Sequence, residues 1–418
     1  MGVFVVEGKK RLDGEVDVQG AKNAVLPILA ATLLSGGENI LHNCPMIQDV
    51  KTTVDILRHI GCKVNVSGNT ISVNSDNIEN SCIPDEMMRR MRSSIIFLGA
   101  IVGRTNTAKV SMPGGCAIGT RPIDIHIKAL RQMGIDIKEE GGYILCSADK
   151  ITAADIALDF PSVGATENIM LAAARAQGTT TITNAAREPE ISDLADFINK
   201  CGGKVSGAGS GYITIEGTDK LSPCEHSIIP DRIAAATYLI YAAAGMGSII
   251  LNNVIPEHMT AVLSVLEEMG LNISLEKERI ILHPVKKINA PSMVRTMPYP
   301  GFPTDVQTPL MALAAMSEGS GVFVETIFEN RFSQVDELRR MGADIQTEGR
   351  VAVVRGSSLC GANVSAKDLR GGAALIAAAI GAEGITRIEN TCYIDRGYEG
   401  IENVISGLGG TIKRITEA

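Results

Sequence analysis

The sequence predicts an α/β protein built from six copies of one unit of about 70 residues. Two series of glycines carry this prediction. One series follows amphipathic stretches, at Gly61, Gly134, Gly202, Gly270, Gly342 and Gly409, with spacings of 67 to 73 residues. The other ends Ala-rich stretches, at Gly37, Gly103, Gly178, Gly247, Gly319 and Gly384, with spacings of 65 to 75 residues. Because two independent markers share one period, the pattern indicates an internal repeat.

The third copy predicts the order of elements within a unit. An Ala-rich helix is expected over residues 165–177, ended by Gly178, the residue type preferred just after a helix. A β-branched strand at 179–183 and an amphipathic helix at 191–200 come next, and a strand pair at 204–206 and 212–215 completes the copy. With one further strand per copy, the order is β-α-β-α-β-β, which implies partly parallel sheets covered by helices.

The two helices of each repeat differ in polarity. The Ala-rich helices lack a polar face and are expected at the centre of a domain, whereas the amphipathic helices are expected outside. With 418 residues, 45% of them apolar, the chain is long enough for two such domains. The nearly uncharged run 233–251 approaches the length of a membrane span, but Gly245 and Gly247 interrupt it, so we expect no span there.

Composition narrows the functional class. A net charge of −8, 4% aromatic residues and the absence of Trp argue against a nucleic-acid-binding protein. Nine cysteines without a CxxC pair, and six histidines without metal-ligand spacing, indicate a reduced, cytosolic protein that needs no metal. The apolar run at the N-terminus is too short for a signal peptide.

The repeat topology predicts where charged residues gather. Because the N-terminus of a helix and the C-terminal end of the following strand lie at the same end, helix openings and post-strand loops should share one face. The helix openings contain Lys22, Asn23, Arg92, Ser162, Val163, Gly164, Asp231, Thr304, Asp305, Asp368 and Arg370, and the loops contain Asp49, Cys116, Arg121, Arg187, Glu188, Glu329, Asp395 and Arg396. The cations and helix N-termini suit phosphorylated or carboxylated ligands, although Asn, Ser, Thr and Asp are also common N-cap residues.

The segment 113–124, Pro-Gly-Gly-Cys-Ala-Ile-Gly-Thr-Arg-Pro-Ile-Asp, combines a thiol with a nearby guanidinium. Its three glycines leave the backbone free to move. Arg121 favours the thiolate form of Cys116 and can bind an anion. The alternative is that Cys116 is an ordinary small apolar residue in a Gly-rich turn.

Several stretches together resemble the enolpyruvyl transferase family. They are Gln-Gly-Ala-Lys-Asn-Ala (19–24), Met-Arg-Ser-Ser-Ile (91–95), the segment 113–124, Ser-Val-Gly-Ala-Thr (162–166), Phe-Pro-Thr-Asp (302–305), Glu-Thr-Ile-Phe-Glu-Asn-Arg-Phe (325–332), Asp-Leu-Arg (368–370) and Ile-Asp-Arg-Gly-Tyr-Glu (394–399). The resemblance covers the whole chain. It implies two inside-out α/β domains of three βαβαββ repeats each, one at 22–229 and one combining 1–21 with 230–418, with the active site in the interdomain cleft.

The resemblance also implies a reaction. An enolpyruvyl group passes from phosphoenolpyruvate to the 3′-hydroxyl of UDP-N-acetylglucosamine, and phosphate leaves by addition and elimination, as the committed step of peptidoglycan synthesis. It implies a cytoplasmic enzyme that uses no cofactor or metal and shows no membrane, nucleic-acid or obligate protein partner. Fosfomycin-type epoxides are expected to alkylate Cys116, and the 112–121 loop is expected to close over the bound sugar nucleotide.

Residue roles follow from the same resemblance. Cys116 is the general acid at C3 of phosphoenolpyruvate or adds to it covalently, roles that need different protonation states. Asp305 is the base for the 3′-hydroxyl or its positioner. The anionic groups of phosphoenolpyruvate are expected to contact Lys22, Arg121 and Arg396, supported by Arg92 and Arg370. The sugar nucleotide is expected to contact Arg121, Pro122, Ile123, Asp124, Ile125, Ser162, Val163, Gly164 and Ile327. Asn23 is expected to contact the sugar nucleotide or the phosphate, and Thr304, Asp305 and Asp368 are further expected substrate-binding residues.

One departure and three alternatives qualify this reading. Many relatives carry Lys just before the Ser-Val-Gly stretch, whereas this chain has Phe160, so contact with the diphosphate there would come from the backbone. The nearest alternative is the sister activity on shikimate 3-phosphate. The others are a non-catalytic sensor of sugar nucleotides and a repeat scaffold for protein partners, which would need an exposed apolar face.

Overall fold

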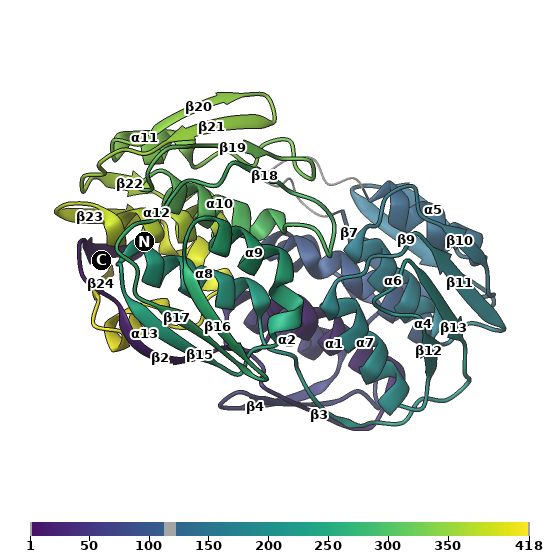
Figure 1. Cartoon of the computed structure of the whole chain (residues 1–418). Helices are drawn as coiled ribbons and strands as arrows, with labels where there is room; N and C mark the ends of the chain where they lie inside the picture. Colours follow the sequence, from purple (N-terminus) through teal and green to yellow (C-terminus); the bar gives the residue numbers. More distant parts are fainter. Residues whose placement is uncertain (1, 113–122, 417–418) are drawn as a thin grey trace. The chain divides into compact units, whose positions relative to one another are not determined.

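The computed structural model describes residues 2–112 and 123–416. Their contacts divide them into two compact units. The first unit comprises residues 20–112 and 123–229, and the second comprises residues 2–19 and 230–416. Within these described residues, six four-stranded sheets, three in each unit, are covered by helices (Figure 1). The predicted α/β class and its six copies are confirmed.

Three inner helices form the centre of each unit. They are α1 (Lys22–Ser35), α4 (Phe97–Thr105) and α6 (Val163–Ala173) in the first unit, and α8 (Arg232–Ala244), α10 (Thr304–Ala314) and α12 (Leu369–Gly381) in the second. Nearly every residue of α1, α8 and α12 is buried. In the first unit α4 packs on α1 and α6, and in the second α10 packs on α8 and α12. The Ala-rich helices therefore lie inside, because small side chains let helices approach closely on all sides.

The remaining helices are outer or short. The outer helices are α2 (Gln48–Ile60), α5 (Asp124–Gln132), α7 (Pro189–Lys200), α9 (Thr260–Glu268), α11 (Val335–Arg340) and α13 (Ile401–Gly407). The short ones are α3 (Asp85–Arg90) and the 3-10 helices η1 (Arg92–Ile96), η2 (Pro256–Met259) and η3 (Thr391–Arg396). The outer helices bury one face and expose polar or charged residues on the other, as amphipathic helices do. Figure 1 shows α10 on one face of the sheet that contains β19 and β21.

The six sheets share one strand order. In the first unit, the first sheet has the strand order β14 (Glu225–Ser227), β3 (Glu38–His42), β5 (Thr70–Asn74), β4 (Lys63–Ser67). The second sheet has the order β6 (Cys82–Ile83), β7 (Thr107–Ser111), β9 (Tyr143–Ser147), β8 (Asp136–Glu140). The third has the order β10 (Asp155–Ala157), β11 (Thr179–Thr183), β13 (Tyr212–Glu216), β12 (Lys204–Ser206). In the second unit, the fourth sheet has the strand order β2 (Asp13–Asp17), β15 (Ser248–Asn252), β17 (Arg279–His283), β16 (Asn272–Glu276). The fifth sheet has the order β18 (Met293–Arg295), β19 (Ser320–Val324), β21 (Val351–Arg355), β20 (Asp344–Glu348). The sixth has the order β22 (Asn363–Ser365), β23 (Ile385–Glu389), β1 (Gly2–Glu7), β24 (Thr411–Thr416). The first two strands named in each sheet are parallel, and the other neighbours are antiparallel.

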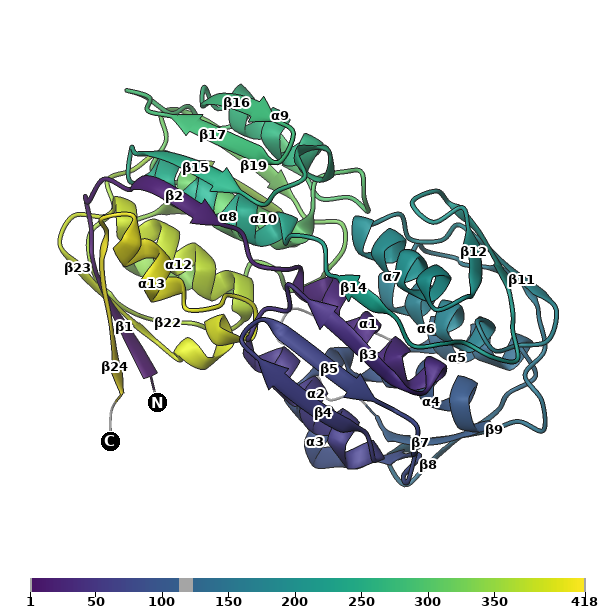
Figure 2. The same cartoon turned by 90° about the horizontal axis from the view of Figure 1, so that it is seen from below.

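Three sheets take one strand from a distant part of the chain. Strand β14, which follows the third copy, completes the sheet of the first copy. Strand β2 completes the sheet of the fourth copy, beside β15. Strand β1 lies between β23 and β24, with Val3 opposite both Glu389 and Ile415 (Figure 2). The expected extra strand is therefore present in every sheet, and in the first and fourth it comes from a distant part of the chain. In the sixth sheet the extra strand is β22, and the distant strand β1 instead forms the antiparallel pair with β24.

The repeated glycines mark left-handed turns in most copies. All six glycines of the first series have positive φ, between 79° and 117°, which explains why the position is glycine in every copy. Four of the six in the second series do so as well. The predicted helix end at Gly103 is wrong, because α4 continues to Thr105 and Asn106 adopts the left-handed conformation. At Gly247 the left-handed residue is Met246, and a side chain on Gly247 would overlap the carbonyl oxygen of Leu12.

The third copy also differs from prediction at its helix boundaries. Helix α6 ends at Ala173, four residues before the expected end at residue 177, because the chain then tightens into turns in which the Arg175 and Ala176 amides bond three residues back. Helix α7 begins at Pro189 rather than at residue 191. The apolar run 233–251 forms most of α8 and part of β15, and no helix in the described ranges is long and apolar enough to cross a membrane.

The crossing of α4 and α6 gives a stability prediction. A side chain at Gly99 would overlap the backbone carbonyl of Asn168 and lie 2.8 Å from its Oδ1, which accepts a hydrogen bond from the Gly99 amide. Gly99→Ala should therefore push the two helices apart and lower the melting temperature by about 4 to 8 °C. Gly407→Ala is the matched control, because nothing lies within 4 Å of a Cβ at that helical position. Equal melting temperatures for the two variants would contradict the prediction.

Candidate active site

Helix openings and post-strand segments meet in both units, as the repeat topology predicts. In the first unit, the Nζ of Lys22 at the start of α1 lies 2.7 Å from the Oδ2 of Asp49, in the first turn of α2. Both residues are buried. In the second unit, Asp305 in the first turn of α10 lies 2.8 Å from Arg331, in the segment after β19. Each contact joins two parts of one repeat that are separated by a strand.

Asp305 is held between two guanidinium groups. Nη2 of Arg331 donates to Oδ1 at 2.8 Å, and Nη2 of Arg370 donates to Oδ2 at 3.0 Å. Both arginines are 3% exposed, whereas the Asp305 side chain is 28% exposed. Charge-assisted bonds to both oxygens fix the orientation of the carboxylate, while part of it stays open to solvent.

The segment after β19 is organised by the buried carboxylate of Glu325. Its oxygens accept hydrogen bonds from the Thr304 hydroxyl at 2.9 Å and from the backbone amides of Ile327 at 2.7 Å and Phe328 at 3.0 Å. Arg331 also donates to the carbonyl of Thr304. Glu325 therefore holds Thr304 and Ile327 in place. Thr304 in turn binds Arg331, which lies beside Asp305.

Arg370 is placed by the start of α12 and by an aromatic ring. Asp368 caps α12 by accepting from the amides of Arg370 and Gly371. The Arg370 guanidinium lies 5.3 Å from the centre of the Tyr398 ring, whose hydroxyl hydrogen-bonds Thr237 of α8. Burial disfavours the charged form, but Tyr398 and the Asp305 carboxylate act in the other direction, so the pKa of Arg370 lies above its ordinary value. Nε and Nη1 of Arg370 are buried without a hydrogen-bond partner among the described residues.

Arg396 lies at the end of η3 and is half-buried. The next residues are tied to the N-terminal segment by Gln19, which donates to the carbonyl of Gly397 and accepts from the amide of Glu399. Its neighbour Asp395 forms a salt bridge with Arg414 at 2.6 Å. Asp395 thus has a structural partner on β24.

In the first unit, the start of α6 presents backbone groups. Ser162 caps the helix by accepting a hydrogen bond from the amide of Ala165 at 3.3 Å. A Cβ on Gly164 would lie 3.1 Å from Cε1 of His126, so only glycine fits easily there. The His126 ring is in turn fixed by Asn168, whose Nδ2 lies 2.8 Å from its Nδ1. Ser162, Val163 and Gly164 all stay partly exposed.

The other expected contacts of the first unit are distributed as follows. Asn23 is the second residue of α1 and is half-buried. Ile123 and Ile125 flank the exposed Asp124 at the start of α5. Three of the expected site residues, Cys116, Arg121 and Pro122, lie outside the described residues. Most of the 112–121 loop, for which closure is expected, lies outside them as well. Arg92, at the start of η1, is described by its backbone alone.

Sequence reasoning missed two supporting residues and one partnership. Arg331 and Glu325 belong to the recognised stretch 325–332 but were given no role. The repeat itself carried the signal for Arg331, because Arg121 and Arg396 also follow the strand after an inner helix. The sequence places Asp49 on the face of the helix openings, but it does not identify Lys22 as the salt-bridge partner of Asp49.

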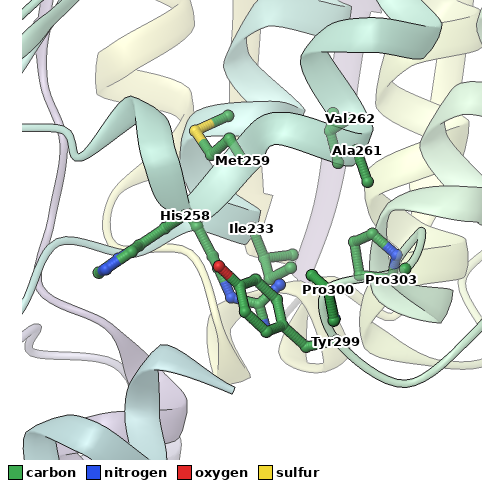
Figure 3. A pocket seen from close by; sticks show the side chains of 10 residues that line it. Ile233, His258, Met259, Ala261, Val262, Tyr299, Pro300 and Pro303 are labelled. Carbon is green, nitrogen blue, oxygen red and sulfur yellow. The ribbon is translucent and has the colours of Figure 1, made fainter. Parts of the chain in front are cut away.

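A surface pocket of the second unit has one wall formed by residues just before Thr304 and Asp305 in the sequence. Figure 3 shows it, lined by Ile233, by His258, Met259, Ala261 and Val262, and by Tyr299, Pro300 and Pro303, with Arg232 and Gly301 completing the wall. Pro303 directly precedes Thr304, and the Arg232 guanidinium lies 5.4 Å from the centre of the Tyr299 ring. None of the residues assigned from the resemblance lines it. Among the described residues no three His, Cys, Asp or Glu side chains are grouped as metal ligands would be.

A buried carboxyl group stands near the start of α7. Glu167 of α6 is 3% exposed. Burial raises the pKa of Glu167 well above its ordinary value, and the carboxylates of Glu190 and Glu188 act in the same direction. Since the folded state holds this proton more tightly than the unfolded state, the stability contributed by Glu167 is full at low pH. It falls as pH rises from the unfolded pKa, about 4.3, towards the raised folded pKa.

Glu167→Gln should remove this pH dependence. The variant should melt about 2 to 4 °C above the unmodified protein at pH 8, and the difference should shrink towards pH 5. Glu139→Gln, at an exposed position on β8, is the control and should show no such trend. Thermal melts across this pH range test the prediction, and a Glu167→Gln variant that melts lower at pH 8 would refute it.

Comparison with known proteins agrees with this architecture. Residues 6–405 match the family model of EPSP synthase (3-phosphoshikimate 1-carboxyvinyltransferase). UDP-N-acetylglucosamine 1-carboxyvinyltransferase 2 of Caldanaerobacter subterraneus is 50% identical over 416 residues, which cover 99% of this chain and 100% of that protein. UDP-N-acetylglucosamine 1-carboxyvinyltransferase 1 of Symbiobacterium thermophilum is also 50% identical, over 99% of this chain and 95% of that protein.

Solved structures extend the match to the fold. The enolpyruvyl transferase NikO of Streptomyces tendae superposes with a TM-score of 0.90 at 23% identity, covering 100% of this chain and 99% of that one. An EPSP synthase of Acinetobacter baumannii superposes with a TM-score of 0.76 at 17% identity, with 100% of both chains covered. With sequence and fold matched over nearly the whole length, this chain belongs to the EPSP synthase family of enolpyruvyl transferases.

Proposed function

We propose that this protein transfers the enolpyruvyl group of phosphoenolpyruvate to the 3′-hydroxyl of UDP-N-acetylglucosamine and releases phosphate. The observation that carries the proposal is the 50% identity, over nearly the full length of both chains, to proteins named UDP-N-acetylglucosamine 1-carboxyvinyltransferase. This reaction is the committed step of peptidoglycan synthesis, and a cytoplasmic location belongs to the same proposal.

The chemistry requires addition followed by elimination. C3 of phosphoenolpyruvate gains a proton while the sugar oxygen attacks C2, which gives a tetrahedral intermediate. The intermediate then loses phosphate and a proton from C3, which restores the double bond. Both steps develop or move charge next to a phosphate and a carboxylate, so fixed cations and amide N–H groups provide the main stabilisation.

Asp305 is the residue that we assign to the 3′-hydroxyl, as its base or its positioner. Arg331 and Arg370 support this role, because they hold both carboxylate oxygens in one orientation before substrate arrives. Arg370 stays charged beside Asp305, which favours a nearby anion as well. Ile327 and Thr304, fixed through Glu325, are assigned to the sugar nucleotide, as is Asp368.

The first unit is assigned to both substrates. The anionic groups of phosphoenolpyruvate are proposed to be bound by Lys22, Arg121 and Arg396, supported by Arg92 and Arg370. The exposed backbone at Ser162 to Gly164 is suited to the diphosphate, since a helix N-terminus attracts anions and Phe160 offers no positive charge. Asn23 and residues 121–125 complete the proposed sugar-nucleotide contacts.

Cys116 is proposed to act at C3 of phosphoenolpyruvate, as the acid or as a covalent nucleophile. Alkylation by an epoxide of the fosfomycin type would identify its reactivity independently of turnover. Because the acid role needs the thiol and the nucleophilic role needs the thiolate, the pH dependence of alkylation and of turnover would separate the two.

The substrate assignment is tested by measuring phosphate release. Phosphoenolpyruvate together with UDP-N-acetylglucosamine should release phosphate and yield a product heavier than the sugar nucleotide by one enolpyruvyl group. Shikimate 3-phosphate is the second acceptor to test, because the family model that matches describes that activity. Release only with shikimate 3-phosphate would replace the proposal, and binding of the sugar nucleotide without release would indicate a sensor.

Replacing Asp305 tests its chemical role. Asp305→Asn keeps the shape of the side chain but removes its charge, so turnover should fall by about 100-fold or more while affinity for UDP-N-acetylglucosamine changes only slightly. Asp336→Asn, at a position on α11 paired with Arg339, is the control and should leave both values unchanged. Steady-state kinetics and calorimetric binding measure the two effects. An equal loss of turnover and affinity would assign Asp305 to binding.

A further inference from the structure

Two cysteines of the first unit lie with their thiols in contact. Cys201 directly follows α7 and Cys224 directly precedes β14, and their sulfur atoms are 3.4 Å apart. Helix α7 has 12 residues, so about 18 Å separates this pair from the opening of the helix, where Glu188 and Glu190 lie. The pair therefore lies at the opposite end of α7 from Glu188 and Glu190.

Backbone hydrogen bonds hold both cysteines in place. The Cys201 amide donates to the carbonyl of Phe197, and its own carbonyl accepts from Ser222 at 2.8 Å. The Cys224 amide donates to Oδ1 of Asn39 at 3.1 Å, and its carbonyl accepts from Ile40. Since both backbones are fixed, little conformational freedom would be lost by joining the two sulfurs.

The same two elements are also joined next to the cysteines. His226 of β14 and Asp193 of α7 are both buried and lie 2.9 Å apart. The edge of the Phe197 ring also packs against the His226 ring. Helix α7 and strand β14 thus already lie together along their length, and the sulfur contact continues this packing to the end of the helix.

The two thiols differ in acidity and access. The hydrogen bond from Cys201 lowers the pKa of Cys224, burial opposes this, and Lys200 adds to the lowering. The same hydrogen bond and burial raise the pKa of Cys201. Cys224 is partly exposed, whereas Cys201 is 2% exposed. In contrast, burial raises the pKa of Cys62 and Cys146 to about 12. Cys224 therefore combines a favoured thiolate with access to solvent.

We propose that Cys201 and Cys224 are an oxidation site that forms a reversible disulfide when the protein meets hydrogen peroxide. The Cys224 thiolate attacks one peroxide oxygen, the O–O bond breaks, and the departing hydroxide takes up a proton to give water. The resulting sulfenic acid is then attacked by the sulfur of Cys201, which loses its proton. The S–O bond breaks, and the oxygen leaves as a second water, so two thiols are oxidised and one peroxide is reduced.

The disulfide would fasten the end of α7 to the start of β14. It would close the loop that contains β12 and β13 and leave the chain fewer unfolded conformations, which stabilises the folded unit. Because the two sulfurs are already in contact, the bond should form without large movement of the backbone. The oxidised protein should consequently melt above the reduced protein.

Peptide mapping tests the site directly. The reduced, purified protein is exposed to hydrogen peroxide, remaining thiols are alkylated, and the protein is digested with trypsin without reduction. Cleavage after Lys200, Lys204, Lys220 and Arg232 places the two cysteines in the peptides 201–204 and 221–232. The expected product is these two peptides joined with the loss of two hydrogen atoms, and separated again by a reductant. The thiols of Cys62 and Cys146 should escape oxidation and should therefore be alkylated, so they serve as unoxidised references.

Single substitutions distinguish the roles of the two thiols. In Cys201→Ala, Cys224 should stop at the sulfenic acid, which a dimedone probe traps, and peroxide should no longer raise the melting temperature. In Cys224→Ala, Cys201 should stay unmodified, because it is buried. Oxidation of Cys224 to sulfinic acid in the unmodified protein without a joined peptide would overturn the proposal. So would failure of both cysteines to react under conditions that oxidise the exposed Cys360.

Discussion

Each unit depends on one packing constraint: three helices without a polar side have to be covered on every face. Sheets and amphipathic helices provide the cover, and the backbone groups of the inner helices bond within the helices except at their ends. Backbone hydrogen-bonding groups of these helices are therefore left without intrahelical partners only at the termini. This is why the residues assigned to the substrates, among them Lys22, Ser162, Thr304 and Asp368, stand at helix openings rather than along helix faces.

The same constraint governs the charges. A charge buried beside an apolar bundle costs several kcal/mol unless it is paired, and the described clusters are paired closely. Asp305 takes both of its oxygens to guanidinium groups, and Lys22 faces Asp49. Glu325 is satisfied by hydroxyl and amide groups instead of by a cation. The polar groups of these clusters consequently orient one another without any ligand.

Sequence reasoning succeeded where a local cause repeats. The positive-φ glycines after the amphipathic helices recur because the same turn recurs, and they gave the period of the fold. It failed where a distant neighbour decides: Gly247 is small because of the carbonyl of Leu12, and Gly103 lies within α4. The repeat marks the position of Arg331, but its partners Asp305 and Thr304 precede it by a strand and most of a helix, so the sequence does not identify them.

The position of β1 between β23 and β24 has a consequence for biosynthesis. The first unit closes with β14, at residues 225–227, so its described strands need nothing beyond that point of the chain. The second unit cannot complete its last sheet until β23, at residues 385–389, and β24, at residues 411–416, have been made, because these two strands flank β1. Val3, Phe4 and Val6 are buried in the finished protein but lack both flanking strands until then. An apolar segment that waits this long for its partners is open to aggregation during synthesis, so β1 is a segment that a chaperone would protect.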